Sequence, residues 1–157
     1  MKYFTCRRCV PGDEVALALL GGATFLETYA SSADAADMLA YVAKEHTIHE
    51  YRDLLSDPHV KIWAAETNEG KSLIGYVVLV TPDPQDASSC EIKRLYVLHR
   101  FHGCGLGERL LSEAIQTTDA DGLKTICLKV QDLNERAQVF YRALASRLCM
   151  KNHAVQD

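Results

Sequence analysis

The sequence lacks long apolar runs and any strong excess of one charge. No apolar run approaches the roughly 18 residues that a membrane span needs, so we expect no membrane partner. Lysine and arginine number 17 against 21 aspartate and glutamate residues, which gives a net charge of -4. Because no basic run is present to neutralise a stretch of phosphates, nucleic acid is a poor candidate partner.

The sequence also lacks a regular set of cysteines. Of the six cysteines, only Cys6 and Cys9 are close together, and no second pair has metal-ligand spacing. We therefore expect reduced, mostly buried thiols and no metal site. Arg7 and Arg8 interrupt the N-terminal segment before the apolar core of a signal peptide could form. These features together predict a cytoplasmic protein.

Length and composition predict one globular domain over residues 1–157. The chain has 157 residues, close to the roughly 150 residues of an average domain. Hydrophobic residues make up 48% and charged residues 24%, which is typical of soluble globular chains. A chain of this length buries a core without needing disulfide bonds.

Hydrophobic patterning predicts a mixed α+β chain whose first third is mostly helical. Pro11-Gly12 follows a first strand, Asp13 is placed to cap a helix, and Gly21-Gly22 divide that helix from a second apolar stretch. The turn at 68–70 joins two strands as an antiparallel hairpin. The expected strands are 3–10, 60–65, 73–80, 90–97 and 125–130, and the expected helices begin at 13, 31, 48, 106 and 134.

The most informative segment joins the strand at 90–97 to the next helix through a glycine-rich loop. Gly103, Gly105 and Gly107 alternate there, and glycine lets backbone amides approach a ligand closely. The unpaired N–H groups of the following helix N-terminus suit a pyrophosphate. A Walker loop would need Gly-Lys-Ser/Thr, and the spacing does not match a Rossmann fingerprint. A glycine-rich turn without a ligand is the alternative. Because the next strand returns after a helix, the strands at 90–97 and 125–130 are expected to be parallel.

This strand, loop and helix resemble motif A of the GNAT superfamily of acetyl-coenzyme A dependent N-acetyltransferases, whose signature is Gln/Arg-x-x-Gly-x-Gly/Ala. Arg100-x-x-Gly103-x-Gly105 matches it literally, and His102-x-x-Gly105-x-Gly107 matches it with His in the first position. The second register is preferred because its glycine pair lies directly before the apolar helix. The resemblance implies a mostly antiparallel sheet with a parallel strand-helix-strand core and helices on both faces.

The resemblance also implies a coenzyme site. The backbone of the strand end would pair with the pantetheine arm, and the loop would hold the pyrophosphate. The implied coenzyme-binding residues are Leu95, Tyr96, Val97, His102, Gly103, Cys104, Gly105, Leu106, Gly107, Glu108, Asn134 and Tyr141.

A second motif follows the strand at 125–130. Asn134 and Tyr141 are two helical turns apart, about 10 Å along the axis, so both project from one face. This stretch resembles the family's Asn-x-x-Ala-x-x-Phe-Tyr, in which the Asn contacts the coenzyme and the Tyr protonates the departing thiolate. A phenol with a pKa near 10 is suited to that role. An N-cap for Asn134 and core packing for Tyr141 are the alternatives.

The acceptor is expected to be a primary amine that attacks the thioester directly in a ternary complex. A carboxylate or a water chain must take its proton, and Glu91 and Glu27 are the candidate bases. The helical first third resembles the bacterial spermidine/spermine N-acetyltransferase branch. Its acidic residues would attract a polyamine, or would simply form a solvated face. These residues are Glu27, Asp34, Asp37, Glu45, Glu50 and Asp53.

Other interpretations stay open. Acetylation of a protein N-terminus or another small amine is one, although Lys129 stands where some N-terminal acetyltransferases have Glu. A coenzyme-binding module without turnover is another, and Cys104 could instead form an acyl-enzyme. His46 and His49 are expected at the surface. The last residues, 147–157, suffice for one short strand at most, so we expect the family's closing hairpin to be missing or supplied by a second copy of the chain.

Overall fold

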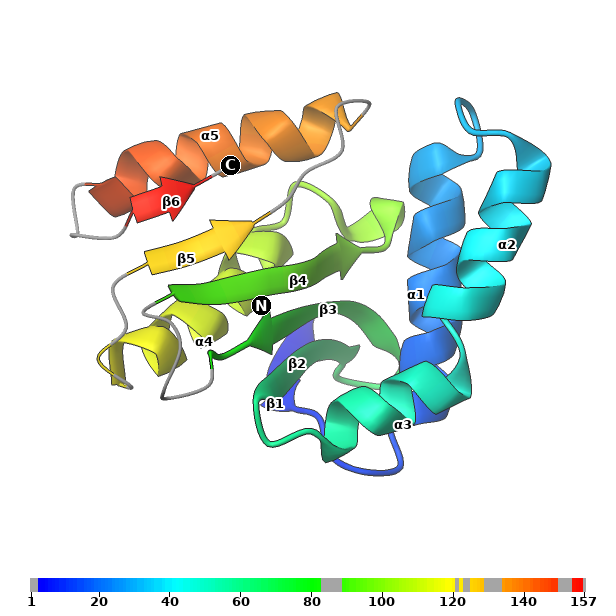
Figure 1. Ribbon diagram of the computed structural model, residues 1–157, viewed down its shortest axis with the longest axis horizontal. Helices are drawn as coiled ribbons and strands as arrows, with labels where there is room; N and C mark the ends of the chain where they lie inside the picture. Colours follow the sequence, from blue (N-terminus) through cyan, green and yellow to red (C-terminus); the bar gives the residue numbers. More distant parts are fainter. Residues whose placement is uncertain are drawn as a thin grey trace.

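The computed structural model describes residues 3–82, 89–120, 122, 125–128, 134–149 and 154–156. Its strands form one six-stranded sheet in the order β1-β2-β3-β4-β5-β6, with helices on both faces (Figure 1). The strands are β1 Phe4–Arg8, β2 Val60–Thr67, β3 Leu73–Val80, β4 Ser89–Val97, β5 Thr125–Leu128 and β6 Ala154–Gln156. The helices are α1 Glu14–Tyr29, α2 Ala35–Glu45, α3 Ile48–Ser56, the 3-10 turn η1 His99–Phe101, α4 Leu106–Ala120 and α5 Glu135–Cys149.

Antiparallel and parallel pairing divide the sheet. β1 to β4 pair antiparallel, which confirms the expected hairpin of β2 and β3. β5 lies parallel to β4 after the α4 crossover, as the order of elements predicts. β6 in turn pairs parallel with β5, with Ala154 opposite Thr125, and it is the one strand after α5 in the described residues.

The alternation of side chains along β3 builds a separate core on each face of the sheet. Val77 and Leu79 pack with Leu110 of α4 on one face. Tyr76 and Val78 pack on the other face against the layer formed by α1 and α3. Strands covered on both faces are expected to be apolar throughout, which is the pattern that β3 shows.

A bulge in β4 reverses which residues face each layer. Val78 lies opposite Arg94 while Leu79 lies opposite Ile92, so the register shifts between them. After the bulge, Tyr96 packs with the core under α1 and α3, whereas Leu95 packs with the core under α4. The bulge therefore turns Arg94 and Tyr96 toward the layer of α1 and α3, whereas Ile92 before it faces α4.

The predicted division of α1 at Gly21-Gly22 is wrong, because a single helix runs from Glu14 to Tyr29. Gly21 is required by packing: a Cβ there would collide with the His46 ring nitrogen and the Tyr51 hydroxyl. The glycine thus permits close contact between α1 and α3 and does not end the helix.

The starts of α2 and α3 are set by side-chain caps. Asp34 accepts hydrogen bonds from the backbone N–H groups of Ala36 and Asp37, so α2 begins at Ala35 and not at the predicted serine pair. Thr47 accepts from Glu50 N–H in the same way at α3.

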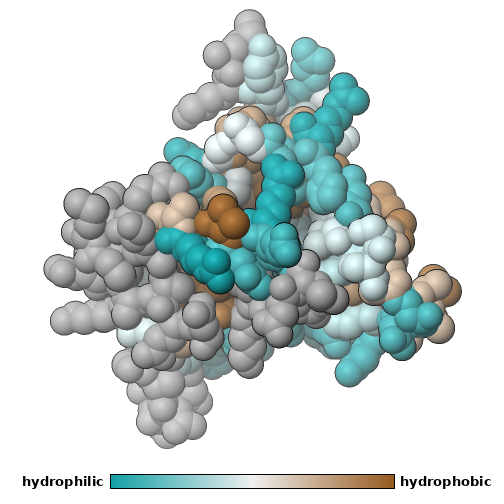
Figure 2. Space-filling model, turned by 90° about the horizontal axis from the view of Figure 1, so that it is seen from above, coloured by the Kyte–Doolittle hydropathy of each residue, from teal (hydrophilic) through white to brown (hydrophobic). Residues whose placement is uncertain are grey.

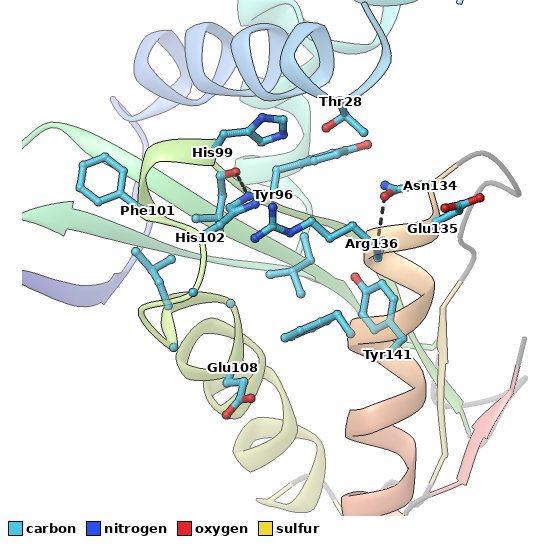
Figure 3. A pocket seen from close by; sticks show the side chains of 18 residues that line it. Thr28, Tyr96, His99, Phe101, His102, Glu108, Asn134, Glu135, Arg136 and Tyr141 are labelled. Atoms are coloured by element: carbon cyan, nitrogen blue, oxygen red, sulfur yellow. Dashed lines mark hydrogen bonds between the residues drawn. The ribbon is translucent and has the colours of Figure 1, made fainter. Parts of the chain in front are cut away.

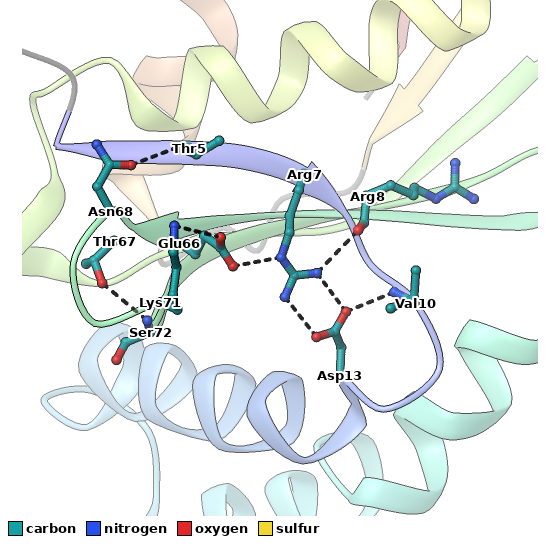
Figure 4. A network of polar contacts seen from close by, with 10 residues as sticks. All are labelled: Thr5, Arg7, Arg8, Val10, Asp13, Glu66, Thr67, Asn68, Lys71 and Ser72. Carbon is teal, nitrogen blue, oxygen red and sulfur yellow. Dashed lines mark hydrogen bonds and ion pairs between the residues drawn. The ribbon is translucent and has the colours of Figure 1, made fainter.

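An ion-pair cluster ties β1, β2 and the start of α1 together (Figure 4). Arg7 donates two hydrogen bonds to Asp13, both at 2.9 Å, and a third to Glu66 at 2.7 Å. Asp13 also accepts from Val10 N–H. The planar guanidinium makes this fork geometry available, which a lysine ammonium does not.

The expectation that His46 lies at the surface is wrong, since only 5% of it is exposed. Its Nδ1 forms a 2.9 Å hydrogen bond with the hydroxyl of Tyr51. His49 is exposed and lies 3.3 Å from Asp53. Of the two histidines expected at the surface, only His49 lies there.

In the part of the chain that the structure describes, no helix combines the length and apolarity needed to span a bilayer.

Candidate functional site

A cavity of about 520 Å³ opens beside the end of β4 (Figure 3). Its walls come from β4, η1, the glycine loop, α4 and the first two turns of α5, and Thr28 of α1 closes one side. Seen from above, hydrophilic side chains border part of a small apolar area near the centre of the molecule (Figure 2).

β4 extends along this cavity. In the described residues, its parallel register with β5 reaches Ile92 opposite Leu128, whereas β4 continues to Val97. On its other side β4 stays paired with β3 as far as Val97. Leu95, Tyr96 and Val97 all line the cavity. The backbone edge of β4 that faces away from β3 thus borders the cavity and has no strand partner in the described residues.

The glycine loop needs glycine for its backbone conformation. Gly103 has φ 80° and Gly105 has φ 78°, values that residues with a side chain rarely adopt. An ideal Cβ at either position would meet no atom within 4 Å, so their space is open toward a ligand. Gly107 lies within α4, where an added Cβ would meet the Phe140 ring at 3.5 Å.

The N-terminus of α4 lies at the cavity. The first intrahelical bond runs from Arg109 N–H to Gly105 C=O at 3.0 Å. The N–H groups of Leu106, Gly107 and Glu108 therefore precede the first intrahelical donor. All three residues line the cavity, and the helix dipole adds positive potential there. This arrangement suits an anion such as a pyrophosphate.

His102 braces the loop against β4. Its Nε2 lies 2.7 Å from the carbonyl oxygen of Val97, and because a carbonyl only accepts, Nε2 carries the proton and donates. Burial lowers the pKa of His102, to which Arg136 and His99 add repulsion, so the ring is neutral near pH 7. The two possible registers of the signature begin at His102 and at Arg100. His102 lines the cavity, whereas Arg100 is exposed and does not line it.

Asn134 and Tyr141 reach the cavity from α5, as their two-turn spacing predicts. Asn134 is the N-cap of α5, because its Oδ1 accepts from Ala137 N–H at 3.1 Å. Burial raises the pKa of Tyr141, with a smaller contribution from the Tyr29 phenol, so the Tyr141 hydroxyl stays protonated at neutral pH.

Most of the predicted site residues share this cavity. Cys104 does not line it, and its exposed thiol donates to Phe101 C=O at 2.9 Å. Glu91 lies opposite Val80 and Cys127, in the paired part of β4, and does not line the cavity either. The predicted residues that do line it are Leu95, Tyr96, Val97, His102, Gly103, Gly105, Leu106, Gly107, Glu108, Asn134 and Tyr141.

Several side chains that line the cavity were not among the predicted site residues, and Arg136 and Thr28 are two of them. Arg136 reaches across from α5 toward His102 (Figure 3). Thr28 comes from α1, far away in the chain, and the side chain of Tyr96 lies on the side of the cavity where Thr28 and Asn134 lie (Figure 3). The signal for Arg136 was available: it is two residues after Asn134 in the first turn of the same helix. No sequence pattern placed Thr28.

The described residues contain no group of three or more His, Cys, Asp or Glu side chains arranged to hold a metal ion.

A known family model spans the part of the chain that forms this cavity. The model described as the acetyltransferase (GNAT) family matches residues 25–145, from the last turns of α1 into α5. The chain belongs to this family. The match includes all cavity-lining residues named above.

Curated relatives of this GNAT chain share part of their length with it. An uncharacterized N-acetyltransferase of Mycobacterium bovis is 32% identical over 91 residues, which is 58% of this chain and 55% of that protein. One of Mycobacterium tuberculosis shows the same identity and coverage. The chain thus matches about half the length of these relatives.

Solved structures share the fold. The PaiA N-acetyltransferase of Thermoplasma acidophilum, solved in complex with coenzyme A, superposes with a TM-score of 0.82 at 19% identity, covering 90% of this chain and 88% of that one. A GCN5-related N-acetyltransferase of Ralstonia eutropha gives a TM-score of 0.71 at 21% identity, covering 90% of each chain.

Proposed function

We propose that the chain transfers an acetyl group from acetyl-coenzyme A to a primary amine, by direct attack in a ternary complex. One observation carries the proposal: a single cavity combines a helix N-terminus suited to an anion, a strand edge with no strand partner in the described residues, and a half-buried phenol. Acetyl-coenzyme A has a pyrophosphate, an amide-bearing arm and a thioester in that order along its length.

The coenzyme would follow this order in the cavity. The pyrophosphate would accept hydrogen bonds from the amides of residues 103–108 at the start of α4. Arg136, across the cavity, would supply a guanidinium to the phosphates. The two amides of the pantetheine arm would pair with the open edge of β4 at Leu95 to Val97, in the manner of an added strand.

The thioester would then lie between β4 and Tyr141. The amine nitrogen attacks the carbonyl carbon, the C–S bond breaks, and the departing thiolate takes the hydroxyl proton of Tyr141. Because burial raises the pKa of Tyr141, that proton is present at neutral pH. The proton of the amine leaves to a water chain or to Glu91, which stays a prediction.

The amine class follows less directly from the structure. Several of the acidic residues that would attract a polyamine already have partners. Glu45 lies 3.1 Å from Arg94, Asp34 caps α2, and Glu27 accepts from His99 N–H. The proposal is therefore a primary amine in general, with polyamines as one class to be tested. Pairing of two copies of the chain also stays a prediction, which sedimentation analysis tests.

The test measures thiol release from acetyl-coenzyme A with a panel of amines that includes spermidine, a small monoamine and a peptide with a free N-terminus. We expect turnover with at least one amine. Tyr141→Phe should lower kcat by roughly 100-fold, the scale of one general acid, while the Kd of coenzyme A changes little. Tyr41→Phe, outside the cavity, is the matched control.

The outcomes separate the alternatives. Coenzyme A binding without thiol release from any amine would favour a binding module. Turnover in which Tyr141→Phe behaves like wild type would remove Tyr141 as the acid.

A further inference from the structure

The two ring nitrogens of His102 have different surroundings. Nε2 lies 2.7 Å from the carbonyl oxygen of Val97 and donates a hydrogen bond to it. Nδ1 is buried, and among the described residues it has no hydrogen-bond partner. Because Nε2 carries a proton both in this neutral tautomer and in the imidazolium, the charge of the ring depends on Nδ1 alone.

Without a ligand, the surroundings of His102 disfavour a proton on Nδ1. A buried N–H group there would have neither water nor a protein acceptor, which costs free energy. The guanidinium of Arg136 reaches toward the ring from α5 (Figure 3), and the centroid of the His99 ring lies 4.8 Å from that of His102. In agreement, burial lowers the pKa of His102 and these two basic neighbours lower it further, against a rise from the hydrogen bond to Val97. The unliganded ring is therefore neutral near pH 7.

The acidic groups near the cavity do not offset this positive potential. Glu27 of α1 raises the pKa of His102 by less than burial lowers it, and its carboxylate already accepts a backbone N–H of η1 at 3.0 Å. Glu108 of α4 and Glu135 of α5 are well separated from the ring in Figure 3. The Tyr96 hydroxyl, from β4, stays protonated because burial raises its pKa. Within the described residues, neither nitrogen of the ring bonds a carboxylate.

A bound pyrophosphate would reverse this balance. The glycine loop begins at the residue after His102 and leads into α4, whose first N–H groups precede the first intrahelical donor at Arg109. A pyrophosphate held there brings negative charge into the cavity that His102 and Arg136 both line. That charge attracts the guanidinium and favours the charged form of a nearby imidazole.

We propose that His102 takes up a proton from the solvent when the coenzyme binds, so that an imidazolium and the Arg136 guanidinium hold the pyrophosphate together. The proton adds to the lone pair of Nδ1, while Nε2 keeps its hydrogen bond to the Val97 carbonyl. This inference rests on the coenzyme binding that the proposed function requires, and not on the acetyl transfer itself.

The direction of the pH effect follows from proton linkage. Over the pH range in which the free protein has a neutral His102 and the complex has an imidazolium, binding consumes protons, so a lower pH strengthens binding. The Kd of coenzyme A changes by at most about tenfold per pH unit, because a single group takes up the proton. Below this range the ring is charged in both states, and above it the ring is neutral in both.

The test counts protons by calorimetry. Coenzyme A is titrated into the full chain at about pH 7 in two buffers that differ in ionisation enthalpy. His102→Gln keeps an N–H donor for the Val97 carbonyl but has no group that titrates near neutral pH. We expect the wild type to take up roughly 0.2–0.8 proton more than this variant. The Kd ratio of variant to wild type should rise roughly three- to tenfold as the pH falls from about 8 to about 6. Titration of the coenzyme's own phosphates cancels in this comparison.

Two other histidines provide the controls. His49→Gln, at an exposed position outside the cavity, should take up as many protons as the wild type. His99→Gln removes the neighbouring ring and should keep most of the uptake. Equal uptake by the wild type and His102→Gln overturns the proposal, and so does a loss of uptake in His99→Gln that His102→Gln does not show.

Nitrogen NMR of the wild-type ring tests the proposal without a substitution at His102. In the unliganded protein at about pH 7 we expect a neutral ring with its proton on Nε2, and with saturating coenzyme A a shift toward two protonated nitrogens. Arg136→Gln should move the titration of the unliganded ring to higher pH, because a positive neighbour is removed, whereas Arg142→Gln should not. A ring that is already charged before coenzyme A binds, or that titrates identically with and without it, overturns the proposal.

These measurements separate the proton uptake from the acetyl transfer. Proton uptake at His102 without thiol release from any amine would leave this inference standing while the acetyl transfer is wrong. Turnover of an amine without proton uptake at His102 would do the reverse. Absence of coenzyme A binding would overturn both.

Discussion

The hydroxyl groups of Tyr51 on α3 and Tyr76 on β3 lie 2.6 Å apart, in a hydrogen bond buried beneath α1. Tyr51 also bonds His46, so a chain of three polar side chains crosses this core. Gly21 packs directly on all three, which makes one glycine of α1 the point where the helix meets the network.

Gly21→Ala is predicted to destabilise the protein although alanine favours helix. The propensity gain is about 1 kcal/mol, whereas forcing a methyl into a packed core costs about 1–3 kcal/mol or more, and here it also separates buried hydrogen-bond partners. We expect a net loss of roughly 2 kcal/mol in the free energy of unfolding, measured by urea denaturation.

Gly22→Ala is the matched control for that change. Its added Cβ would meet Val42 at 3.5 Å, an ordinary contact. The substitution should stabilise the protein by roughly 0.5–1 kcal/mol. Stabilisation by both alanines would show that the Gly21 contact does not constrain α1.

Stability should fall in mild acid because of His46. Burial, together with Arg94, lowers the pKa of His46 to about 4. The unfolded chain, with a histidine pKa near 6.5, binds a proton that the folded chain excludes. The lowered pKa of His46 therefore reduces the free energy of unfolding in acid. The loss is absent above pH 6.5 and grows to about 3 kcal/mol as the pH falls toward 4.

The measurement is the urea midpoint as a function of pH. His46→Gln should flatten the curve between pH 6.5 and 4, whereas His49→Gln, at an exposed position, should leave it unchanged. A wild-type curve that is already flat in this window would contradict the buried neutral histidine.

Arg136→Gln is predicted to weaken coenzyme binding without harming the fold. The exposed guanidinium crosses the cavity toward the loop, where the phosphates would bind. We expect the Kd of coenzyme A, measured by calorimetry at low salt, to rise roughly three- to tenfold, with a smaller effect at high salt because of screening. Arg142→Gln, exposed on the same helix and outside the cavity, should change the Kd little. Equal effects of the two substitutions would argue against a direct contact.

Arg7→Ala should cost about 1–3 kcal/mol of stability, because it leaves two partly buried carboxylates without their shared partner. Arg7 lowers the pKa of Asp13, so the stabilisation is present above the usual carboxyl pKa and is lost as the pH falls below it. Arg52→Gln removes a 3.7 Å pair between an exposed guanidinium and Glu14, and it should cost little. Thermal unfolding at pH 7 compares the two, and similar losses would show that the Arg7 cluster is no stronger than a surface pair.

Much of the fold could be read from local patterns. The hairpin of β2 and β3, the β4-α4-β5 crossover and the α5 start at Asn134 all follow from periodicity, turn residues and caps within a few positions of one another. The glycine loop could also be predicted locally, because the positive φ angles at positions 103 and 105 favour glycine there.

Predictions failed where a residue is constrained by contacts with residues far away in the sequence. Gly21-Gly22 resembles a helix stop, yet glycine is needed at position 21 because His46 and Tyr51 pack against it. The sequence around His46 suggests a surface residue, but Phe25 of α1 and Tyr96 of β4 pack near its ring and only 5% of it is exposed.

The sequence by itself determined the family, the α+β class and the glycine loop, since each depends on short-range backbone geometry and on motifs read within one segment. Only the tertiary structure decided that Glu27 meets His99 and that Arg136 crosses the cavity. The physical reason is that these contacts join residues that local preference never brings together. They form when helices pack on the two faces of the sheet and the last turn of α1 comes to lie against the end of β4.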